Sequence, residues 1–317
     1  MSKHRFLYHM TALTVSAVWG VTFVSTKVLI NAGMQPMAIF AVRFLVAYAG
    51  IWLFSLPRPE ARRVWSRTWK DELVFLFLGI TGGSLYFLME NTALAHTQAS
   101  NVSFLVCSAP LFTALLTLLW RKIGRGRFVE GLEDVRAGWL LLLGTLLALS
   151  GMALLVFDGS RVHFSAKGDL LAVGAALCWA FYSLFMGEMT HTYGSVFATR
   201  KVFFYGLLTI LPMAGTFGES LSPSILFRPE VILNLLFLGL IASLAGFIAW
   251  NLAMDKLGNV TSTNYVYMNP VFTLVFAVAF LGERMTLSGA LGSLAILAGV
   301  FLAGLRMPED KPEMIRS

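Results

Sequence analysis

The sequence is short of charge. Only 13% of its 317 residues are Asp, Glu, Lys or Arg, and 57% are hydrophobic, whereas a soluble domain carries about 25% charged residues. It holds two cysteines, Cys107 and Cys178, which form no disulfide framework and no metal-ligand spacing. The motifs HExxH, GxSxG and Walker A are absent. We therefore predict no enzyme, no cofactor and no ATP-driven step within this chain.

The sequence consists largely of long apolar runs. A helix of about 20 residues spans the ~30 Å hydrocarbon core of a bilayer, and runs of this length recur along the whole sequence. The fold class predicted is an all-α integral membrane protein with ten transmembrane helices and short connections. The predicted spans are residues 10–30, 36–56, 73–94, 99–120, 138–157, 169–188, 196–217, 231–254, 259–281 and 287–305.

The net charge of +7 would suit nucleic acid, but the basic residues alternate between loops. Five Lys or Arg residues lie in 58–70 and five in 121–136, whereas 31–35 and 95–98 hold none. This alternation is the positive-inside signal. It predicts a multi-pass protein in a lipid bilayer, with both termini in the cytoplasm and with no nucleic acid as partner.

The two ends of the chain need separate treatment. A basic N-terminus precedes the first span, as in a signal peptide, but no small-x-small cleavage site follows the apolar core, so we predict a retained helix. The polar segment 306–317 contains two prolines and is predicted to be a disordered cytoplasmic tail.

The sequence contains its own near-copy, and one constant displacement relates the main motifs of the two copies. Each copy holds a Trp, then an Asn-x-Ala motif, then a proline; the pairs are Trp19 and Trp179, Asn91 and Asn251, Pro110 and Pro270. Five spans per copy is an odd number, so the second copy enters the membrane from the opposite side. We predict two inverted five-helix repeats, 10–157 and 169–305, with a solute site where they meet.

These motifs resemble the drug/metabolite transporter superfamily, as a pair of EamA-type domains. The resemblance rests on Trp19-Gly20 with Phe23 and Lys27, on Pro36 with Phe40-Ala41-Val42-Arg43-Phe44, on Asn91 to Pro110, and on Asn251 to Pro270 with Leu281-Gly282-Glu283-Arg284. One departure is that Lys122-Ile123 stands opposite Gly282-Glu283. The resemblance implies a ten-helix alternating-access carrier of the bacterial plasma (inner) membrane that moves amino acids, other metabolites or drugs, mostly outward.

Charged residues inside the spans are the first candidates for a site. Glu90 lies about five residues inside the predicted outer end of its span, where a charge is costly unless it faces a cavity or a partner. Tyr86 lies one turn earlier on the same face. Arg43 could hold a substrate carboxylate through two parallel hydrogen bonds. The alternative is that Glu90 simply pairs with Arg43 or with Lys27, and Lys27 itself is expected to reach toward lipid headgroups.

Polar and aromatic residues supply further candidates. Asn91 and Asn251 either hydrogen-bond neighbouring helices or contact substrate. The tryptophans Trp19, Trp179 and Trp250 could form a wall for an aromatic or cationic solute, or pack ordinarily. Other predicted inward-facing residues are Ser103, Asn264 and Tyr267.

Two other features of the spans bear on the mechanism. Pro110 and Pro270 lie near mid-span and predict helix kinks, which serve as hinges or as fixed bends that shape the cavity. Arg200 and Lys201 lie near the predicted inner surface, where we expect them to anchor to lipid phosphate or to a neighbouring loop.

Four functions compete. The first is export of a small metabolite such as an amino acid, because Arg43 and Glu90 offer one charge of each sign. The second is efflux of cationic or aromatic drugs. A membrane-embedded enzyme has no motif in its favour, and the paired polar residues inside the spans argue against a non-transporting membrane subunit. Coupling to protons through Glu90 and simple exchange both stay open, and a monomer is favoured over a homodimer because one chain supplies both repeats.

Overall fold

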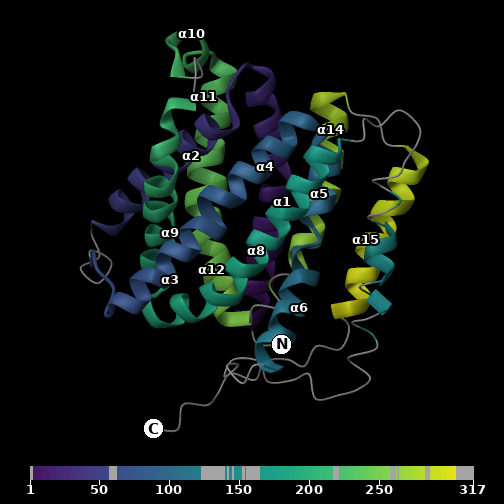
Figure 1. Cartoon of the computed structure of the whole chain (residues 1–317), viewed down its shortest axis with the longest axis horizontal. Coiled ribbons are helices and arrows are strands. Elements are labelled where there is room, and N and C mark those ends of the chain that lie inside the picture. Colours follow the sequence, from purple (N-terminus) through teal and green to yellow (C-terminus); the bar gives the residue numbers. More distant parts are fainter. Residues whose placement is uncertain are drawn as a thin grey trace.

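The structure is a computed structural model. It describes residues 3–56, 63–122, 165–216, 221–257, 264–282 and 286–304, together with 140, 143, 144, 146–151, 154 and 262. The elements within these residues are helices that form one bundle (Figure 1). The tail 306–317 and most of the predicted fifth span, 138–157, lie outside the described residues.

Several helices are suited to a bilayer by length and composition. Those long and apolar enough to cross it are Phe6–Asn31, Pro36–Ser55, Trp69–His96, Ala166–Tyr193 and Pro229–Leu257; shorter apolar helices cover Ala99–Thr113, Tyr265–Leu281 and Leu287–Gly299. Large apolar side chains point away from the bundle, among them Leu170, Phe280 and Leu287, each more than 70% exposed. Such a surface suits hydrocarbon and would be an aggregation hazard in water.

In the described part of the first half, seven helical elements have defined bounds. They are α1 (Lys3–Asn31), α2 (Pro36–Ser55), α3 (Trp69–Gly79), the π-helical turn η2 (Ile80–Ser84), α4 (Leu85–His96), α5 (Ala99–Val106) and α6 (Ala109–Lys122). Local sequence explains two of the starts. Pro36 occupies the first turn of α2, where its missing N–H is not needed. The Thr68 side chain caps α3 by accepting from the Asp71 backbone N–H at 3.2 Å.

The second half follows the same order. Its elements are α8 (Ala166–Tyr193), α9 (Ser195–Ile210), η3 (Leu211–Thr216), α10 (Pro223–Leu226), α11 (Pro229–Leu236), the π-helical η5 (Phe237–Ala245), α12 (Gly246–Leu257), η6 (Asn264–Met268), α14 (Asn269–Leu281) and α15 (Leu287–Gly304). A π-helical segment precedes both α4 and α12, and the starts of these two helices are within one position of being equivalent in the two copies. The duplication seen in sequence is thus repeated in the positions of the helix breaks.

Both predicted proline kinks are interruptions of the helix. In the first half α5 ends at Val106, and α6 begins at Ala109, directly before Pro110. In the second half η6 is a 3-10 helix, and α14 starts at Asn269 with Pro270 in its first turn. A proline in a first turn removes no hydrogen bond. The prolines therefore begin new helices at these breaks and do not bend continuous ones.

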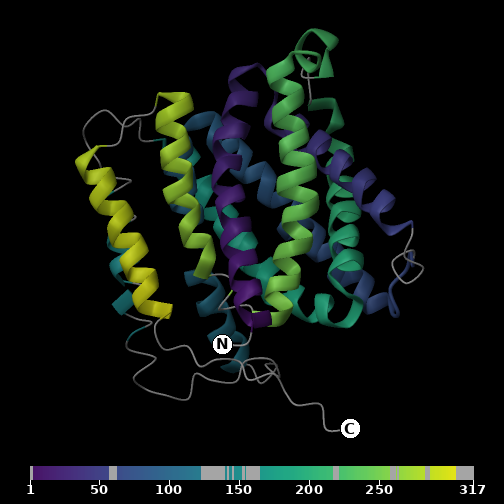
Figure 2. The same ribbon diagram turned by 180° about the vertical axis from the view of Figure 1, so that it is seen from behind.

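Small residues let the helices approach closely around α1 and at the edge of the bundle. A Cβ on Gly20 would lie 2.6 Å from the Asn269 carbonyl oxygen, so α1 and α14 touch through their backbones. A Cβ on Gly299 would lie 2.5 Å from the Gly144 oxygen, which places α15 against the segment around residues 144–151. Figures 1 and 2 both show α15 at one edge, while α1 runs through the middle.

Candidate functional site

A small cavity lies near the middle of the bundle, where the breaks of α4, α5, α12 and α14 converge. Its lining comes from the first half through Trp19, Thr22, Phe23, Arg43, Tyr86, Phe87, Glu90 and Val106, and from the second half through Trp179, Phe247, Val266 and Asn269. The volume open to the centre of a water molecule is about 30 Å³, and one water molecule needs roughly 10–15 Å³ by this measure. In this conformation the cavity therefore has room for water but not for a metabolite.

Five predicted site residues meet in this cavity: Trp19, Arg43, Tyr86, Glu90 and Trp179. They come from four helices, α1, α2, α4 and α8, and the last of these belongs to the other half of the sequence. Three features that the sequence predicted separately therefore lie in one cavity. They are the Glu90 and Tyr86 face of α4, Arg43 of α2, and the repeated tryptophan, Trp19 and Trp179.

Glu90 is the negative group of the cavity. It lies on α4 and is 3% exposed. The Tyr86 hydroxyl, one turn earlier, lies close enough to interact with its carboxylate, but the Oε2 oxygen has no hydrogen-bond partner among the described residues. A buried carboxylate oxygen without a donor is costly. It is the kind of group that a bound cation or proton would satisfy.

Arg43 is the positive group. It is 2% exposed, its Nε donates to Ser243 Oγ at 2.6 Å, and its guanidinium lies 4.4 Å from the centroid of the Phe87 ring. Arg43 and Glu90 interact electrostatically. No ion pair within 4 Å joins them, however, in the part of the chain that the structure describes. Within the described residues, the two charges therefore face one cavity without forming a direct ion pair with each other.

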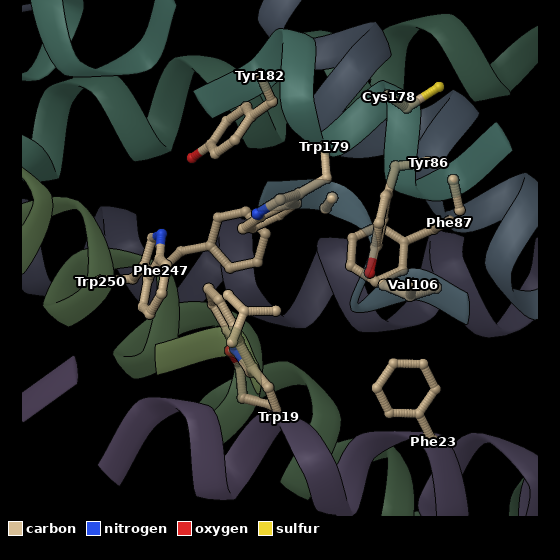
Figure 3. Packing of buried hydrophobic residues seen from close by; sticks show 14 of the residues in the cluster. Trp19, Phe23, Tyr86, Phe87, Val106, Cys178, Trp179, Tyr182, Phe247 and Trp250 are labelled. Atoms are coloured by element: carbon tan, nitrogen blue, oxygen red, sulfur yellow. The ribbon is translucent and has the colours of Figure 1, made fainter. Parts of the chain in front are cut away.

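Aromatic rings form the walls. Trp19 and Trp179 meet edge to face, with ring centroids 5.3 Å apart, and Phe247 packs on both at 5.7 and 6.0 Å. Tyr86 lies 5.4 Å from Trp179. Figure 3 shows Trp19 and Trp179 reaching toward each other from α1 and α8, with Phe247 beside them. Such walls can contact a cation or an apolar side chain.

Two more polar atoms of the lining lack a partner among the described residues: Trp179 Nε1, a donor, and Asn269 Oδ1, an acceptor. Buried polar groups are normally hydrogen-bonded. Together with Glu90 Oε2, they give the cavity two acceptors and one donor that a polar solute could engage.

Other predicted site residues bond neighbouring helices and do not line the cavity. The Asn91 amide donates to the Pro36 carbonyl at 3.0 Å, and the Asn251 amide donates to Thr199 at 2.9 Å. Asn251 also accepts from the Tyr182 hydroxyl at 3.1 Å. For both asparagines, the geometry favours the helix-to-helix alternative.

The remaining candidates also lie outside the lining. Ser103 accepts from Thr273 at 2.8 Å, which ties α5 to α14. Trp250 is buried against Trp19, with centroids 4.9 Å apart, and Tyr267 is 8% exposed. The Asn264 side chain is outside the described part of the chain, although its backbone begins η6.

Sequence reasoning missed several residues of the lining. Asn269 was not among the predicted site residues, and its position just before Pro270 at a helix break is the signal that could have identified it. Phe23, Phe87 and Phe247 gave no signal, because aromatic residues are ordinary in apolar spans. Lys27 has a different role from the one expected, since its Nζ donates to the carbonyls of Leu94 and Thr97 near the end of α4, at 2.5 and 2.8 Å.

The profile of the EamA-like transporter family matches this chain twice, over residues 6–129 and 166–305. The chain belongs to the EamA-like transporter family. It is thus a multi-pass membrane transporter built of two EamA domains, and not an enzyme, as the motifs predict.

Relatives of this EamA transporter cover nearly its whole length. A protein of Archaeoglobus fulgidus called an uncharacterized transporter is 27% identical over 95% of this chain and 97% of its own. A probable terminal-alkyne amino-acid exporter of Streptantibioticus cattleyicolor is 25% identical over 92% and 94%, and a probable amino-acid metabolite efflux pump of Escherichia coli is 24% identical over 92% of each. A crystal structure matches the EamA transporter with a TM-score of 0.62 at 19% identity, over 97% of this chain and 98% of the other, which supports the fold alone.

Proposed function

We propose that this EamA transporter exports an amino acid, or a closely related small zwitterion, by alternating access. The observation that carries the proposal is the pair Arg43 and Glu90. Both are buried, both line the cavity, and no ion pair joins them within the described residues. Buried charges are costly unless they are paired. A zwitterion brings both partner charges at once, with its carboxylate toward Arg43 and its ammonium toward Glu90 Oε2 and Asn269 Oδ1.

Two relatives add weight to this substrate class, since their names describe amino-acid or amino-acid metabolite export. The substrate-binding residues we propose are Glu90, Arg43, Tyr86, Trp19 and Trp179, with Asn269 added. We propose that the other predicted residues form a surrounding layer that fixes the helices: Asn91, Asn251, Ser103, Trp250 and Tyr267. Asn264 stays a predicted site residue, and its side chain lies outside the described residues.

The architecture we propose is ten transmembrane helices in two inverted five-helix repeats, 10–157 and 169–305, in a bacterial inner membrane with both termini cytoplasmic. The repeated helix breaks support the repeats, and the basic loops support the orientation. Both halves line the cavity, so a monomer can transport. Glu90 is the group we expect to carry a proton in exchange for substrate.

Efflux of cationic or aromatic compounds is the second candidate. The rings of Trp19, Tyr86, Phe87 and Trp179 around one carboxylate would suit an organic cation. In this alternative Arg43 has no substrate group to bind and serves only to position helices through Ser243 and Phe87.

Competition in proteoliposomes separates these candidates. Uptake of a labelled amino-acid mixture by the purified protein is challenged with an unlabelled amino acid, with the matching amine that lacks the carboxylate, and with the matching acid that lacks the amine. Competition by the amino acid alone supports the zwitterion. Equal competition by the amine favours the cation alternative, and an absence of any uptake above protein-free liposomes removes the amino-acid proposal.

A further inference from the structure

A second polar cluster lies away from the cavity, where α3 packs on α9. Lys201 Nζ and Glu72 Oε1 are 2.7 Å apart, and the two side chains are only 5% and 6% exposed. The other ion pairs of the described residues, made by Asp255, each include a partner that is about half exposed or more. An ion pair buried on both sides is expensive to build and strongly destabilising to break from one side.

Glu72 joins three segments of the chain. It accepts from Lys201 and from the Tyr205 hydroxyl, both on α9, and from the backbone N–H of Ser66 at 2.7 Å. The Lys201 ammonium also lies 5.1 Å from the centroid of the Trp65 ring. This ion pair thus connects α9 to residues 65 and 66, just before α3.

Further contacts hold the same segment to the second half of the molecule. The backbone N–H of Arg67 donates to the Tyr193 hydroxyl at 2.8 Å, and that hydroxyl donates to Asp71 at 2.6 Å. Arg200 donates to the Arg63 carbonyl and lies over the Trp52 ring at 4.3 Å. Arg200 therefore anchors to a neighbouring loop, one of the two roles expected for it, whereas Lys201 pairs with an acidic side chain.

The backbone beyond this cluster is suited to movement. The π-helical turn η2 separates α3 from α4, and Gly83 within it has non-helical angles of φ −125° and ψ −106°. A Cβ on Gly79 would lie 2.4 Å from Tyr205 Cβ, so α3 and α9 approach closely just before this turn. Movement of α3 about η2 would leave Glu90 and Tyr86, which lie on α4, in place.

The equivalent positions of the other half have no such pair. Ile232 is the counterpart of Glu72 in the second copy and is 37% exposed, and Phe44 is the counterpart of Lys201 in the first copy. The buried pair is therefore a feature of one end of the bundle. In Figure 1 this end, at the start of α3, is the one at which the N-terminus lies, and α10 lies at the opposite end.

We propose that Glu72, Lys201 and Tyr205 form a latch that closes one end of the transport pathway. The latch holds α3 and residues 63–68 against α9 in the conformation described here, and it must separate before solute passes at that end. With the orientation proposed above, this is the cytoplasmic end, where a substrate for export is loaded. The inference rests on transport by alternating access but not on the identity of the substrate.

The test measures access to the cavity from each side of the membrane. Thr22 lines the cavity, so Thr22→Cys is introduced together with Cys107→Ala and Cys178→Ala, and a membrane-impermeant maleimide is added from one side of oriented proteoliposomes. Glu72→Gln should raise the labelling rate from the latch side by about tenfold or more, because it removes one partner of a buried ion pair. Labelling from the other side should not rise.

Control variants separate the latch from general loosening. Glu188→Gln neutralises an exposed glutamate of α8 and should leave both rates unchanged. The exchange Glu72→Lys with Lys201→Glu should restore a slow rate on the latch side. If Glu72→Gln does not fold, Tyr205→Phe removes a single hydroxyl and should give a smaller rise on the same side.

A rise on both sides, or no rise with either Glu72→Gln or Tyr205→Phe, would overturn the latch. Uptake assays on the same preparations keep the two proposals apart. Side-specific labelling without amino-acid uptake would support the latch and reject the substrate proposed above.

Discussion

Trp19 and Trp179 occupy equivalent positions, and each packs against a helix of the other repeat. The two contacts differ in which polar atoms have hydrogen-bond partners. In the second half, the face of α12 carries Gly246 and Trp250, with Ala242 of η5 before them. Trp19 fills this face: its Nε1 donates to the Ala242 carbonyl at 3.0 Å, a Cβ on Gly246 would lie 2.9 Å from that nitrogen, and the Trp250 ring lies 4.9 Å away. The face is apolar and closed.

In the first half, the equivalent face carries Gly82, Tyr86 and Glu90, the counterparts of Ala242, Gly246 and Trp250. Trp179 packs there against Tyr86, but its Nε1 has no partner among the described residues, and neither has Glu90 Oε2. The two copies share one framework, and a carboxylate in the first takes the place of an indole in the second. Both charged side chains that line the cavity, Arg43 and Glu90, therefore belong to the first half.

Glu90→Gln should have the largest effect on this difference. Hydrogen bonds to charged groups contribute about 1.5–3 kcal/mol, so we expect kcat/KM for uptake to fall by about 10- to 100-fold. Uptake driven by an imposed pH gradient should be lost as well. Glu188→Gln is the matched control, and pH-driven uptake that survives in Glu90→Gln would remove this residue from proton coupling.

Arg43→Ala should come next and should depend on the substrate. Loss of the guanidinium removes the partner of a carboxylate, and we expect KM for the amino acid to rise by about tenfold. Any uptake of the matching amine should not weaken to the same degree. Arg43→Lys should fail to restore the amino acid, because an ammonium cannot make two parallel hydrogen bonds. Equal losses for both substrates would indicate that Arg43 acts on helix packing.

A pair of glycine substitutions compares the two faces directly. A Cβ on Gly82 would lie 2.1 Å from the buried Tyr182 ring, whereas one on Gly246 would lie 2.9 Å from Trp19 Nε1. Overpacking costs about 1–3 kcal/mol, and Gly82→Ala should lie at the upper end of this range and Gly246→Ala at the lower end. Melting temperatures in detergent measure both, and the reverse order would contradict the closer approach of Tyr182 to Gly82.

Trp250→Phe should have the smallest effect. Its Nε1 has no hydrogen-bond partner in the described part of the chain, so removal of the nitrogen leaves no group unsatisfied, and only some ring volume is lost. We expect a change below about 1 kcal/mol in stability and little change in uptake. A loss of uptake comparable to that of Glu90→Gln would mean that the second face also binds substrate.

The sequence predicted the helical membrane class, the family and five residues of the cavity, because a charge or a deep tryptophan is conspicuous in an apolar span. It predicted less where contacts depend on partners far apart. Glu72 and Lys201 are separated by 129 residues, and nothing near Glu72 in the sequence distinguishes it from an ordinary acidic residue at a helix start. The proline positions were found, but whether a proline bends a helix or begins a new one is decided by tertiary packing.

The contact between Trp19 and Trp179 has a consequence for how such a molecule could arise. These residues are equivalents of each other, so under the proposed pseudo-twofold relation a residue that touches its own counterpart lies on the axis. Their rings nevertheless meet edge to face at 87°, and two identical partners cannot both be the edge. An assembly of two separate, identical subunits would have to choose between two equal arrangements at its centre. Fusion into one chain lets natural selection fix a single arrangement.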